Sequence, residues 1–424
     1  MSEHFSDMRS LAGSLAEALN LIDSSIENHH QQTAYLAHMI AQAAGFDQKM
    51  RERTVNAALT HDIGFITIDE PGSVAAVERQ AKELARIGAA IIEGFPHSAH
   101  IADIVRFSQT RWEEFLSLPE NKQEKCGVTA RIASVVHLAD TVSTVIRTDI
   151  PILNQVKEIC TGIASLRDKE FSAEAVDAFL RVSENEFIWM DLRYNPQFLS
   201  YFTGTTQSVS LDETVELTKV ISRVIDYRSA FTAMHSAGVS ASAAALARLA
   251  GMTGDECKMM RIAGYMHDIG KLKVPRAILE KPGKLTEEEF NIIKEHPYYT
   301  RLNTMNVEGF EKISMWAGFH HEKLNGKGYP FHIGGDQLDT GSRIMAVADI
   351  FSAITEIRPY RAEMSREQAM NVLNENVRSG GIDGDLVALL NEHYEEINRL
   401  REEAAQTEGN RYYESIGRIQ EDAK

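Results

Sequence analysis

Hydrophobic residues recur at intervals of three and four positions along most of the chain. Two such series are Leu15, Leu19, Ile22 and Ile26, and Leu217, Val220, Ile221 and Val224. This spacing gathers apolar side chains on one face of a helix. Sustained alternation of apolar and polar residues is nearly absent, and the only short extended pieces that we expect lie in the Gly-rich stretch 325–341. We therefore predict an all-α fold.

The two halves of the chain share an order of short motifs. H-D-I-G begins at His61 and again at His267, and a histidine precedes each by 32 positions, at His29 and His235. Near-constant offsets indicate an internal repeat of about 200 residues, the length of a domain. The later motifs are E-G-F at Glu93 and Glu308, and A-D at Asp140 and Asp349. The two copies are offset by 206 positions at H-D-I-G, by 215 at E-G-F and by 209 at A-D.

This repeat predicts two tandem helical domains. We place the first over residues 1–195 and the second over residues 210–400. The join lies between Asn195 and Ser210, where N-P and T-G-T-T-Q-S-V-S interrupt the helical pattern. Residues 401–424 form a charged tail, which we expect to be helical and either solvated or an interaction helix.

Composition narrows the classes of function. The 424 residues include 44 Lys and Arg against 61 Asp and Glu, a formal net charge of −17, which disfavours binding to a nucleic acid polymer through its phosphates. No apolar stretch reaches the roughly 18 residues of a membrane span, so we expect no membrane partner. Cys126, Cys160 and Cys257 are too few and too scattered for a disulfide framework or a thiolate zinc site. The expected location is the cytoplasm.

Histidine and aspartate gather in the second half. Taken alone, a histidine on a helix is more often packed or exposed than a metal ligand. Adjacent imidazoles such as His320 and His321 are rare in a packed core, however, because each would need a buried partner. The His-Asp pair shortly before a Gly places two types of metal ligand at a helix end. Imidazole and carboxylate without thiolate suit iron, manganese or another divalent first-row metal. The candidates are His235, His267, Asp268, His296, His320, His321 and Asp349.

Longer motifs surround these residues between Leu211 and Leu390. They are H-S at His235, H-D-I-G-K at His267, V-P at Val274, K-P-G-K-L-T at Lys281, H-P at His296, H-H-E at His320, N-G-K-G-Y-P at Asn325, R-I-M-A-V-A-D at Arg343 and R-P-Y-R at Arg358. On these motifs the second half resembles an HD-GYP domain, the metal-dependent cyclic dinucleotide phosphodiesterase branch of the HD superfamily.

The resemblance implies a two-metal site. A hydroxide that bridges two metals would attack the phosphodiester in line. Family members with three metals carry a glutamate four residues before the first ligand histidine, and Phe231 stands at that position here. We therefore expect two metals, and we expect Phe231 to line the cavity or the core. One metal would be held by His235, His267, Asp268 and Asp349, and the other by His296, His320 and His321, with Asp268 bridging both.

The resemblance also implies substrate contacts. Asp268 and Lys271 would be catalytic, with Lys271 contacting the phosphate or giving a proton to the leaving ribose oxygen; a solvated lysine at a helix end would explain its residue type as well. Arg358 matches a substrate-binding arginine, and Arg361 stands where a lysine is often found. The Gly328, Tyr329 and Pro330 loop is either an access loop beside the site or a structural turn.

The first half departs from the family pattern. It keeps His29, His61, Asp62 and Asp140, so a single metal could bind there, although an inherited packed pair explains His61 and Asp62 equally well. Without a second ligand set, two-metal hydrolysis is not expected. We interpret this half as a degenerate HD domain used for packing, dimerisation or regulation. The replaced positions are Phe65 for the lysine, Ala81 for the central histidine, and Ser108 and Gln109 for the histidine pair.

Three functions are compatible with the sequence. The first is hydrolysis of a cyclic dinucleotide, either c-di-GMP, the substrate common in the family, or 3',3'-cGAMP, whose phosphodiesterases have a similar tandem arrangement. The second is a broader HD nucleotide phosphohydrolase, against which the G-Y-P and R-P-Y-R motifs argue. The third is a non-catalytic signalling adaptor, for which the first half has the expected broken ligand set and the second half does not.

Overall fold

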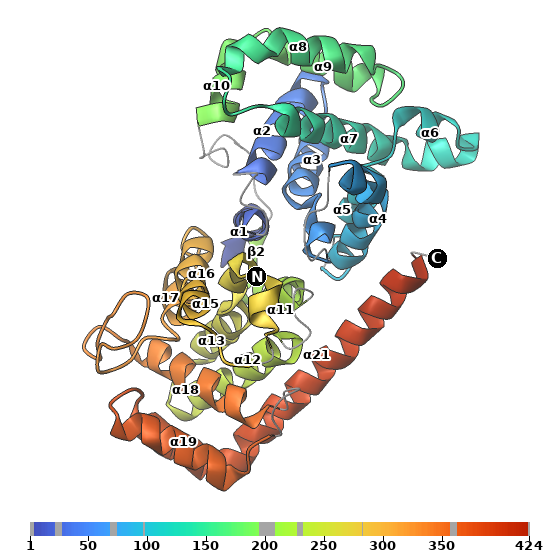
Figure 1. The fold of residues 1–424 in the computed structure, drawn as a ribbon. Helices are drawn as coiled ribbons and strands as arrows, with labels where there is room; N and C mark the ends of the chain where they lie inside the picture. The colour runs from blue at the N-terminus through green and yellow to red at the C-terminus, as the bar shows by residue number, and fades with distance from the viewer. Residues whose placement is uncertain are drawn as a thin grey trace. The chain divides into compact units, whose positions relative to one another are not determined.

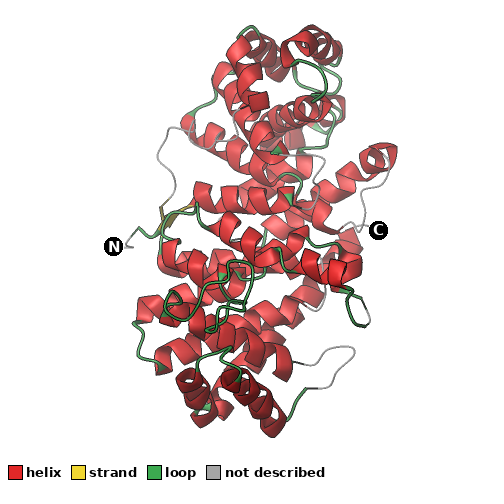
Figure 2. Cartoon of the chain, turned by 60° about the vertical axis from the view of Figure 1, so that its left-hand side comes forward, coloured by secondary structure: helices red, strands yellow, loops and turns green. Residues whose placement is uncertain are grey.

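The computed structural model describes residues 4–21, 28–67, 74–95, 98–194, 208–226, 232–281, 283–356 and 363–422. These residues are mostly helical (Figure 2), and the prediction of an all-α fold is confirmed. The prediction of short extended pieces in 325–341 is wrong, because residues 325–339 are loop and turn and residues 340–341 begin a helix. The strands of the described part are β1 (Ser6–Asp7) and β2 (Ser208–Val209), which pair antiparallel.

The chain divides into two compact units. One contains Met1–Ser14 and Ser208–Arg418, and the other contains Leu15–Gln207 and Ile419–Lys424. Helix α1 (Met8–Asn20) therefore runs through the boundary. No helix in the described ranges combines the length and the apolar character that crossing a membrane requires.

The first domain is a helical bundle around α2. Its core includes Trp189, Phe171 and Phe179, which are almost fully buried. Helix α2 packs against α3, α7 and α9. The elements are α2 (His29–Ala43), α3 (Gln48–Thr60), η1 (Ile63–Thr67), α4 (Val74–Ile92), α5 (Ala99–Phe107), α6 (Trp112–Leu116), α7 (Glu120–Val145), α8 (Ile152–Ser165), α9 (Ala173–Ser183) and α10 (Glu186–Tyr194) (Figure 1).

The second domain repeats this plan around α12, which packs against α13 and α18. Capping boxes fix the starts of α13, at Thr253 and Glu256, and of α15, at Thr286 and Glu289. The elements are α11 (Leu211–Asp226), α12 (Thr232–Leu249), α13 (Gly254–Met266), η3 (Ile269–Lys273), α14 (Arg276–Leu279), α15 (Glu287–Ile293), α16 (His296–Thr304), α17 (Glu311–Gly318), α18 (Thr340–Thr355), α19 (Arg366–Arg378), α20 (Gly384–Glu392) and α21 (Tyr394–Asp422).

The C-terminal tail is part of a longer helix. Helix α21 begins at Tyr394, before the tail predicted from residue 401. Arg401 and Glu408 are buried, and Glu408 accepts a hydrogen bond from Arg223 Nε at 2.7 Å. The expectation of a helix is therefore right, whereas full solvation is wrong for these two residues.

Two glycines allow the helices that carry the candidate ligands to approach closely. A Cβ atom at Gly264 in α13 would lie 2.4 Å from Ser240 Cα in α12. A Cβ atom at Gly270 in η3 would lie 2.0 Å from the His296 carbonyl oxygen at the start of α16. Since real Cβ atoms do not approach so closely, only glycine permits these crossings.

We predict that Gly264→Ala destabilises the second domain by about 1–3 kcal/mol, the usual cost of overpacking a core. The added methyl group would push α12 from α13 and separate His235 from His267. Urea unfolding measures the change. Gly254→Ala is the matched control, because it lies on the same helix with no atom within 4 Å of the added Cβ. Equal stability of the two variants would contradict the crossing as described.

Candidate metal centre

Five helical segments bring the predicted ligands of the second domain together. His235 lies in α12, and His267 and Asp268 follow the last residue of α13. His296 begins α16, and Asp349 lies in α18. The adjacent His320 and His321 follow the end of α17.

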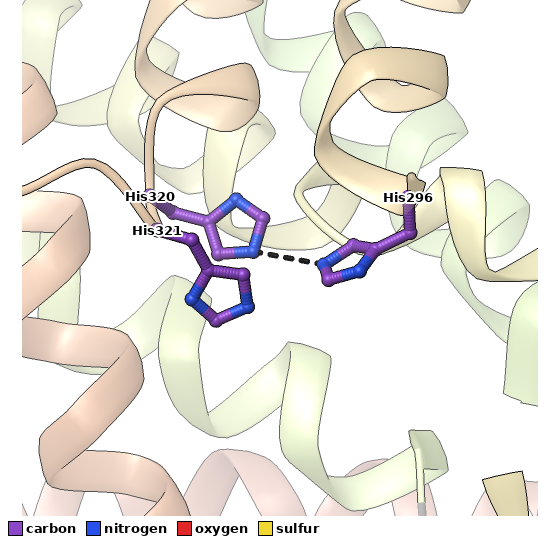
Figure 3. Close-up of side chains that lie close together, drawn as sticks. All are labelled: His296, His320 and His321. Atoms are coloured by element: carbon purple, nitrogen blue, oxygen red, sulfur yellow. Dashed lines mark hydrogen bonds between the residues drawn. The ribbon is translucent and has the colours of Figure 1, made fainter. Parts of the chain in front are cut away.

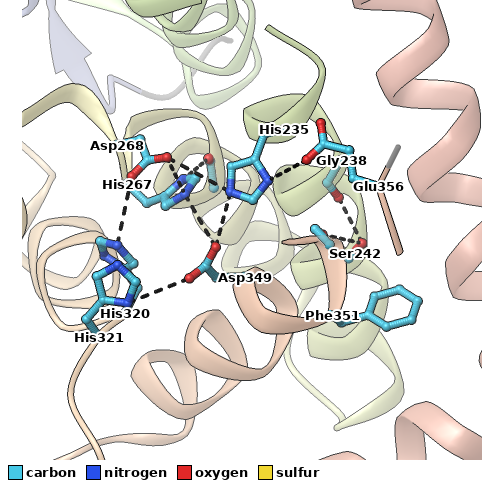
Figure 4. Close-up of polar contacts among 12 residues, drawn as sticks. His235, Gly238, Ser242, His267, Asp268, His320, His321, Asp349, Phe351 and Glu356 are labelled. Carbon is cyan, nitrogen blue, oxygen red and sulfur yellow. Dashed lines mark hydrogen bonds and ion pairs between the residues drawn. The ribbon is translucent and has the colours of Figure 1, made fainter. Parts of the chain in front are cut away.

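Asp268 lies between two groups of imidazoles. Its Oδ2 atom is 3.2 Å from His267 Nε2 and 3.9 Å from His235 Nε2. Its Oδ1 atom is 3.4 Å from His296 Nε2 and 4.0 Å from His320 Nε2. The side chain is 1% exposed. One carboxylate thus presents a different oxygen to each group (Figure 4).

Asp349 faces the same two groups from α18. Its Oδ1 atom is 3.1 Å from His235 Nε2 and 4.0 Å from His267 Nε2. Its Oδ2 atom is 3.8 Å from His321 Nδ1. The Asp349 carboxylate therefore lies near His235 and His267 and also brings its second oxygen toward the other group.

The second group consists of three converging imidazoles. His296 Nε2 and His320 Nε2 are 3.2 Å apart, and His321 stands beside them (Figure 3). His321 has a side chain that is 28% exposed, whereas those of His296 and His320 are fully buried. The centre is therefore open on the side of His321.

Main-chain carbonyls orient three of the histidines. The Nδ1 atoms of His267, His296 and His320 lie 2.6–2.8 Å from the carbonyl oxygens three residues earlier. Each carbonyl belongs to the last turn of a helix, where it has no helical partner. A proton on Nδ1 leaves the Nε2 lone pair free to bind a metal, the arrangement usual for ligand histidines.

The charge states of His296, His320 and Asp268 suit a divalent metal. Burial, which penalises the charged form, lowers the pKa of His296 to about 3 and that of His320 to about 4, so both are neutral at neutral pH. Burial acts to raise the pKa of Asp268, but His267 and Lys271 hold it well below its ordinary value. Neutral imidazoles beside an ionised carboxylate are the states that metal binding requires.

His267 Nε2 and Asp268 Oδ1 are among the buried atoms of this cluster that have no hydrogen-bond partner. A buried polar atom without a partner costs about 1–3 kcal/mol. A cation beside each of them would remove that cost. The imidazole and carboxylate donors therefore fit divalent first-row metals.

Lys271 lies at the edge of the centre. Its Nζ donates a hydrogen bond of 2.6 Å to Asp268 Oδ2. Its side chain is 21% exposed, so the ammonium group touches the shared carboxylate and solvent at once.

The G-Y-P loop borders the open side. The Tyr329 ring lies against the His321 ring, with centroids 4.8 Å apart. A Cβ atom at Gly328 would lie 2.4 Å from Glu322 Cα, so glycine lets the loop pack on the H-H-E segment. Pro330 follows in a cis peptide. The loop therefore lies beside the candidate centre and also makes structural contacts.

Three predicted residues, Phe231, Arg358 and Arg361, lie outside the described residues. Sequence reasoning missed two buried carboxylates. Glu322 Oε1 accepts hydrogen bonds from the main-chain N–H groups of Phe331 and His332. Glu356 Oε2 lies 3.3 Å from His235 Nδ1. Its spacing of seven positions from Asp349, two helical turns, is a signal that could have found it.

The first domain holds a smaller cluster of the retained residues. Asp62 Oδ2 is 3.2 Å from His61 Nε2, and Asp140 Oδ1 is 3.1 Å from His29 Nε2. The His61 Nε2 atom is buried without a hydrogen-bond partner. His29, His61, Asp62 and Asp140 lie close enough together to hold one metal.

Among the described residues of the first domain, no second ligand group corresponds to His296, His320 and His321. Gln109 Nε2 donates to Asp140 Oδ2 at 3.1 Å, and the Ser108 hydroxyl donates to the Val105 carbonyl. A Cβ atom at Gly64 would meet the Leu84 carbonyl at 2.1 Å, as one at Gly270 would meet that of His296. Leu84, rather than the predicted Ala81, therefore occupies the place of the central histidine.

Comparison with known proteins places both halves in one kind of domain. Residues 219–386 match a family model described as HD domain, and residues 26–145 match another with the same description. The 3'3'-cGAMP-specific phosphodiesterase 1 of Vibrio cholerae serotype O1 is 29% identical over 389 residues, which cover 88% of each chain.

Two further proteins are similar. The cyclic di-GMP phosphodiesterase response regulator RpfG of Xanthomonas campestris pv. campestris is 34% identical over 155 residues, 36% of this chain and 41% of its own. The crystal structure of a cyclic GMP-AMP specific phosphodiesterase of Vibrio cholerae, V-cGAP3, aligns with a TM-score of 0.64 and 21% identity, over 91% of this chain and 97% of that one. At that identity the alignment shows a shared fold.

We predict that Asp268→Ala removes metal from both groups of the second domain while the chain stays folded. The reason is that each group loses the Asp268 carboxylate, whose two oxygens face both groups. Manganese content after reconstitution, measured by mass spectrometry, should fall from about two equivalents to below one. The measurement is made with His61→Ala and Asp62→Ala present, so that the first domain does not contribute.

Asp336→Ala, which removes an exposed aspartate of the same domain, is the control. Circular dichroism and thermal unfolding report the fold. Full metal occupancy in folded Asp268→Ala would contradict the shared-carboxylate arrangement.

Proposed function

The chain belongs to the HD-domain family, and from this premise we propose that its second domain is a metal-dependent phosphodiesterase that hydrolyses a cyclic dinucleotide to a linear dinucleotide. The observation that carries the proposal is the position of Asp268, whose two oxygens face two separate imidazole groups. A carboxylate shared by two ligand groups is suited to a pair of metals that act on one phosphodiester.

Each group has a defined ligand set. His235, His267, Asp268 and Asp349 would hold one metal. His296, His320 and His321 would hold the other, with Asp268 shared. Imidazole and carboxylate ligands favour iron or manganese. When bound, the metals would supply an activated water and neutralise the phosphodiester charge.

The remaining roles fall to the chain's own residues at the open side. The Lys271 ammonium group would contact a phosphate oxygen or donate a proton to the leaving ribose oxygen, since its side chain is partly exposed and already contacts Asp268. Tyr329 would form a wall of the substrate entrance through its contact with His321. Arg358 and Arg361 stay predicted substrate contacts.

The substrate that we propose first is 3',3'-cGAMP. The relative that aligns over 88% of this chain is named as specific for it. The cyclic di-GMP phosphodiesterase of Xanthomonas aligns over 36%, which makes c-di-GMP the second candidate. A broader nucleotide phosphohydrolase has less support, and the convergence of seven candidate ligands favours an enzyme over an adaptor.

The first domain has a regulatory or structural role in this proposal. Its cluster offers four ligands in a single group, and Gln109 stands where the histidine pair would be. It would bind one metal at most. A homodimer stays a prediction of the sequence, which sedimentation analysis would test.

We also propose a cytoplasmic location. Cys126, Cys160 and Cys257 are free thiols, a state that a reducing compartment maintains.

With manganese or ferrous iron, the full chain should convert 3',3'-cGAMP to a linear dinucleotide, because the two ligand groups would place the metals at one phosphodiester. Chromatography of the products measures the reaction, c-di-GMP is run in parallel, and a chelator should abolish turnover. Preferential release of phosphate from mononucleotides would instead indicate a broader phosphohydrolase. Full metal occupancy without any turnover would indicate a non-catalytic adaptor.

The double variant His61→Ala with Asp62→Ala should retain hydrolysis within about threefold of the unmodified chain, because the chemistry needs two metals and the first domain offers one ligand group. Steady-state rates, unfolding and size in solution are compared. A folded double variant of unchanged oligomeric state that hydrolyses no cyclic dinucleotide would contradict the assignment of chemistry to the second domain.

A further inference from the structure

His235 is oriented differently from the other buried histidines of the centre. His267, His296 and His320 each follow the last turn of a helix, where a carbonyl is available to Nδ1. His235 lies within α12, where main-chain carbonyls already accept the helical hydrogen bonds. Its Nδ1 atom therefore needs a partner from a side chain.

We propose that Glu356 is that partner and acts as a positioning residue for His235. Its Oε2 atom lies 3.3 Å from His235 Nδ1, and the residue is 7% exposed. On the other edge of the ring, Asp349 Oδ1 lies 3.1 Å from Nε2. The inference rests on the proposed function, because it concerns a ligand of the proposed first metal.

Helix α18 supplies both carboxylates that hold this ring. Asp349 lies within the helix, and Glu356 is the residue directly after its last turn. The seven positions between them correspond to two helical turns, so both side chains face α12 (Figure 4). The imidazole of His235 is held between them, and a proton on Nδ1 facing Glu356 leaves Nε2 for the metal.

The C-terminal helix brings a buried cation whose charge interacts with that of Glu356. Arg401 in α21 is buried and packs over Gly238, one turn after His235. A Cβ atom at Gly238 would lie 3.2 Å from the Arg401 Cγ atom. Burial lowers the pKa of Arg401, and the negative charge of Glu356 is among the charges that oppose this lowering. A buried carboxylate needs such compensation.

An anionic acceptor at Nδ1 makes Nε2 a better electron donor to a metal. Loss of such a partner typically weakens metal binding about 10–100-fold. Because Glu356 contacts His235, which belongs to only one of the two ligand groups, the effect should be confined to the metal held by His235, His267, Asp268 and Asp349.

The test compares manganese binding to the full chain and to Glu356→Gln, with His61→Ala and Asp62→Ala in both proteins. Free manganese is measured by electron paramagnetic resonance. We expect one of the two binding steps to weaken about 10–100-fold and the other to stay unchanged. Glu363→Gln is the matched control, since Glu363 is an exposed carboxylate of the same segment.

Two further readouts separate positioning from a structural role. Unfolding of the metal-free protein should change little, and saturating manganese should restore kcat. Glu356→Asp keeps the negative charge but moves it away from His235, so it should weaken the same binding step by a smaller factor. If Glu356→Gln does not fold, the affinity of Glu356→Asp tests the inference instead. Equal weakening of both steps, or unchanged affinity, would overturn the inference.

The binding measurement is independent of turnover. If the unmodified chain binds two manganese ions but hydrolyses no cyclic dinucleotide, the proposed function fails. The affinity comparison still decides whether Glu356 positions His235.

Discussion

The burial of one carboxylate constrains the second domain more than any other feature. Asp268 is 1% exposed and ionised, and an ionised group in the interior is costly unless other groups compensate its charge. Lys271 supplies one compensating charge at 2.6 Å. The remaining compensation of the Asp268 charge would come from the proposed metals, between its two oxygens and the surrounding imidazoles. The position of Asp268 relates the other parts of the site to one another. The ligand histidines, the helix ends that orient them and the proposed metals are all arranged around this side chain.

Close helix packing makes that position possible. Gly264 lets α13 approach α12, and Gly270 lets η3 approach the start of α16. His267 and Asp268 lie between these two contacts along the chain, so both crossings aim them at the centre. The first domain keeps the same contact at Gly64 against Leu84. It has therefore kept the frame of the site while losing the histidines that would form a second group.

Much of this was predictable because the relevant signals are local in the sequence. The three- and four-residue periodicity predicted the helices, and the H-D-I-G repeat predicted two HD domains, both of which are confirmed. Glu356 was missed because its role depends on a helix crossing between α18 and α12. The offset that pointed to Ala81 fails because α4 and α16 are preceded by connections of different length, and the packing identifies Leu84. The extended pieces expected in 325–341 are absent because Gly-rich sequence permits turns as readily as strands.

The central claim is that Asp268 is shared by two metals, and diffraction tests it most directly. Crystals of the full chain grown with manganese and measured at the manganese edge would locate each ion by its anomalous scattering. The account predicts two peaks in the second domain, about 3.5–4 Å apart, one beside His235, His267 and Asp349 and the other beside His296, His320 and His321, with the Asp268 carboxylate between them. A single peak, or three peaks in that domain, would contradict it.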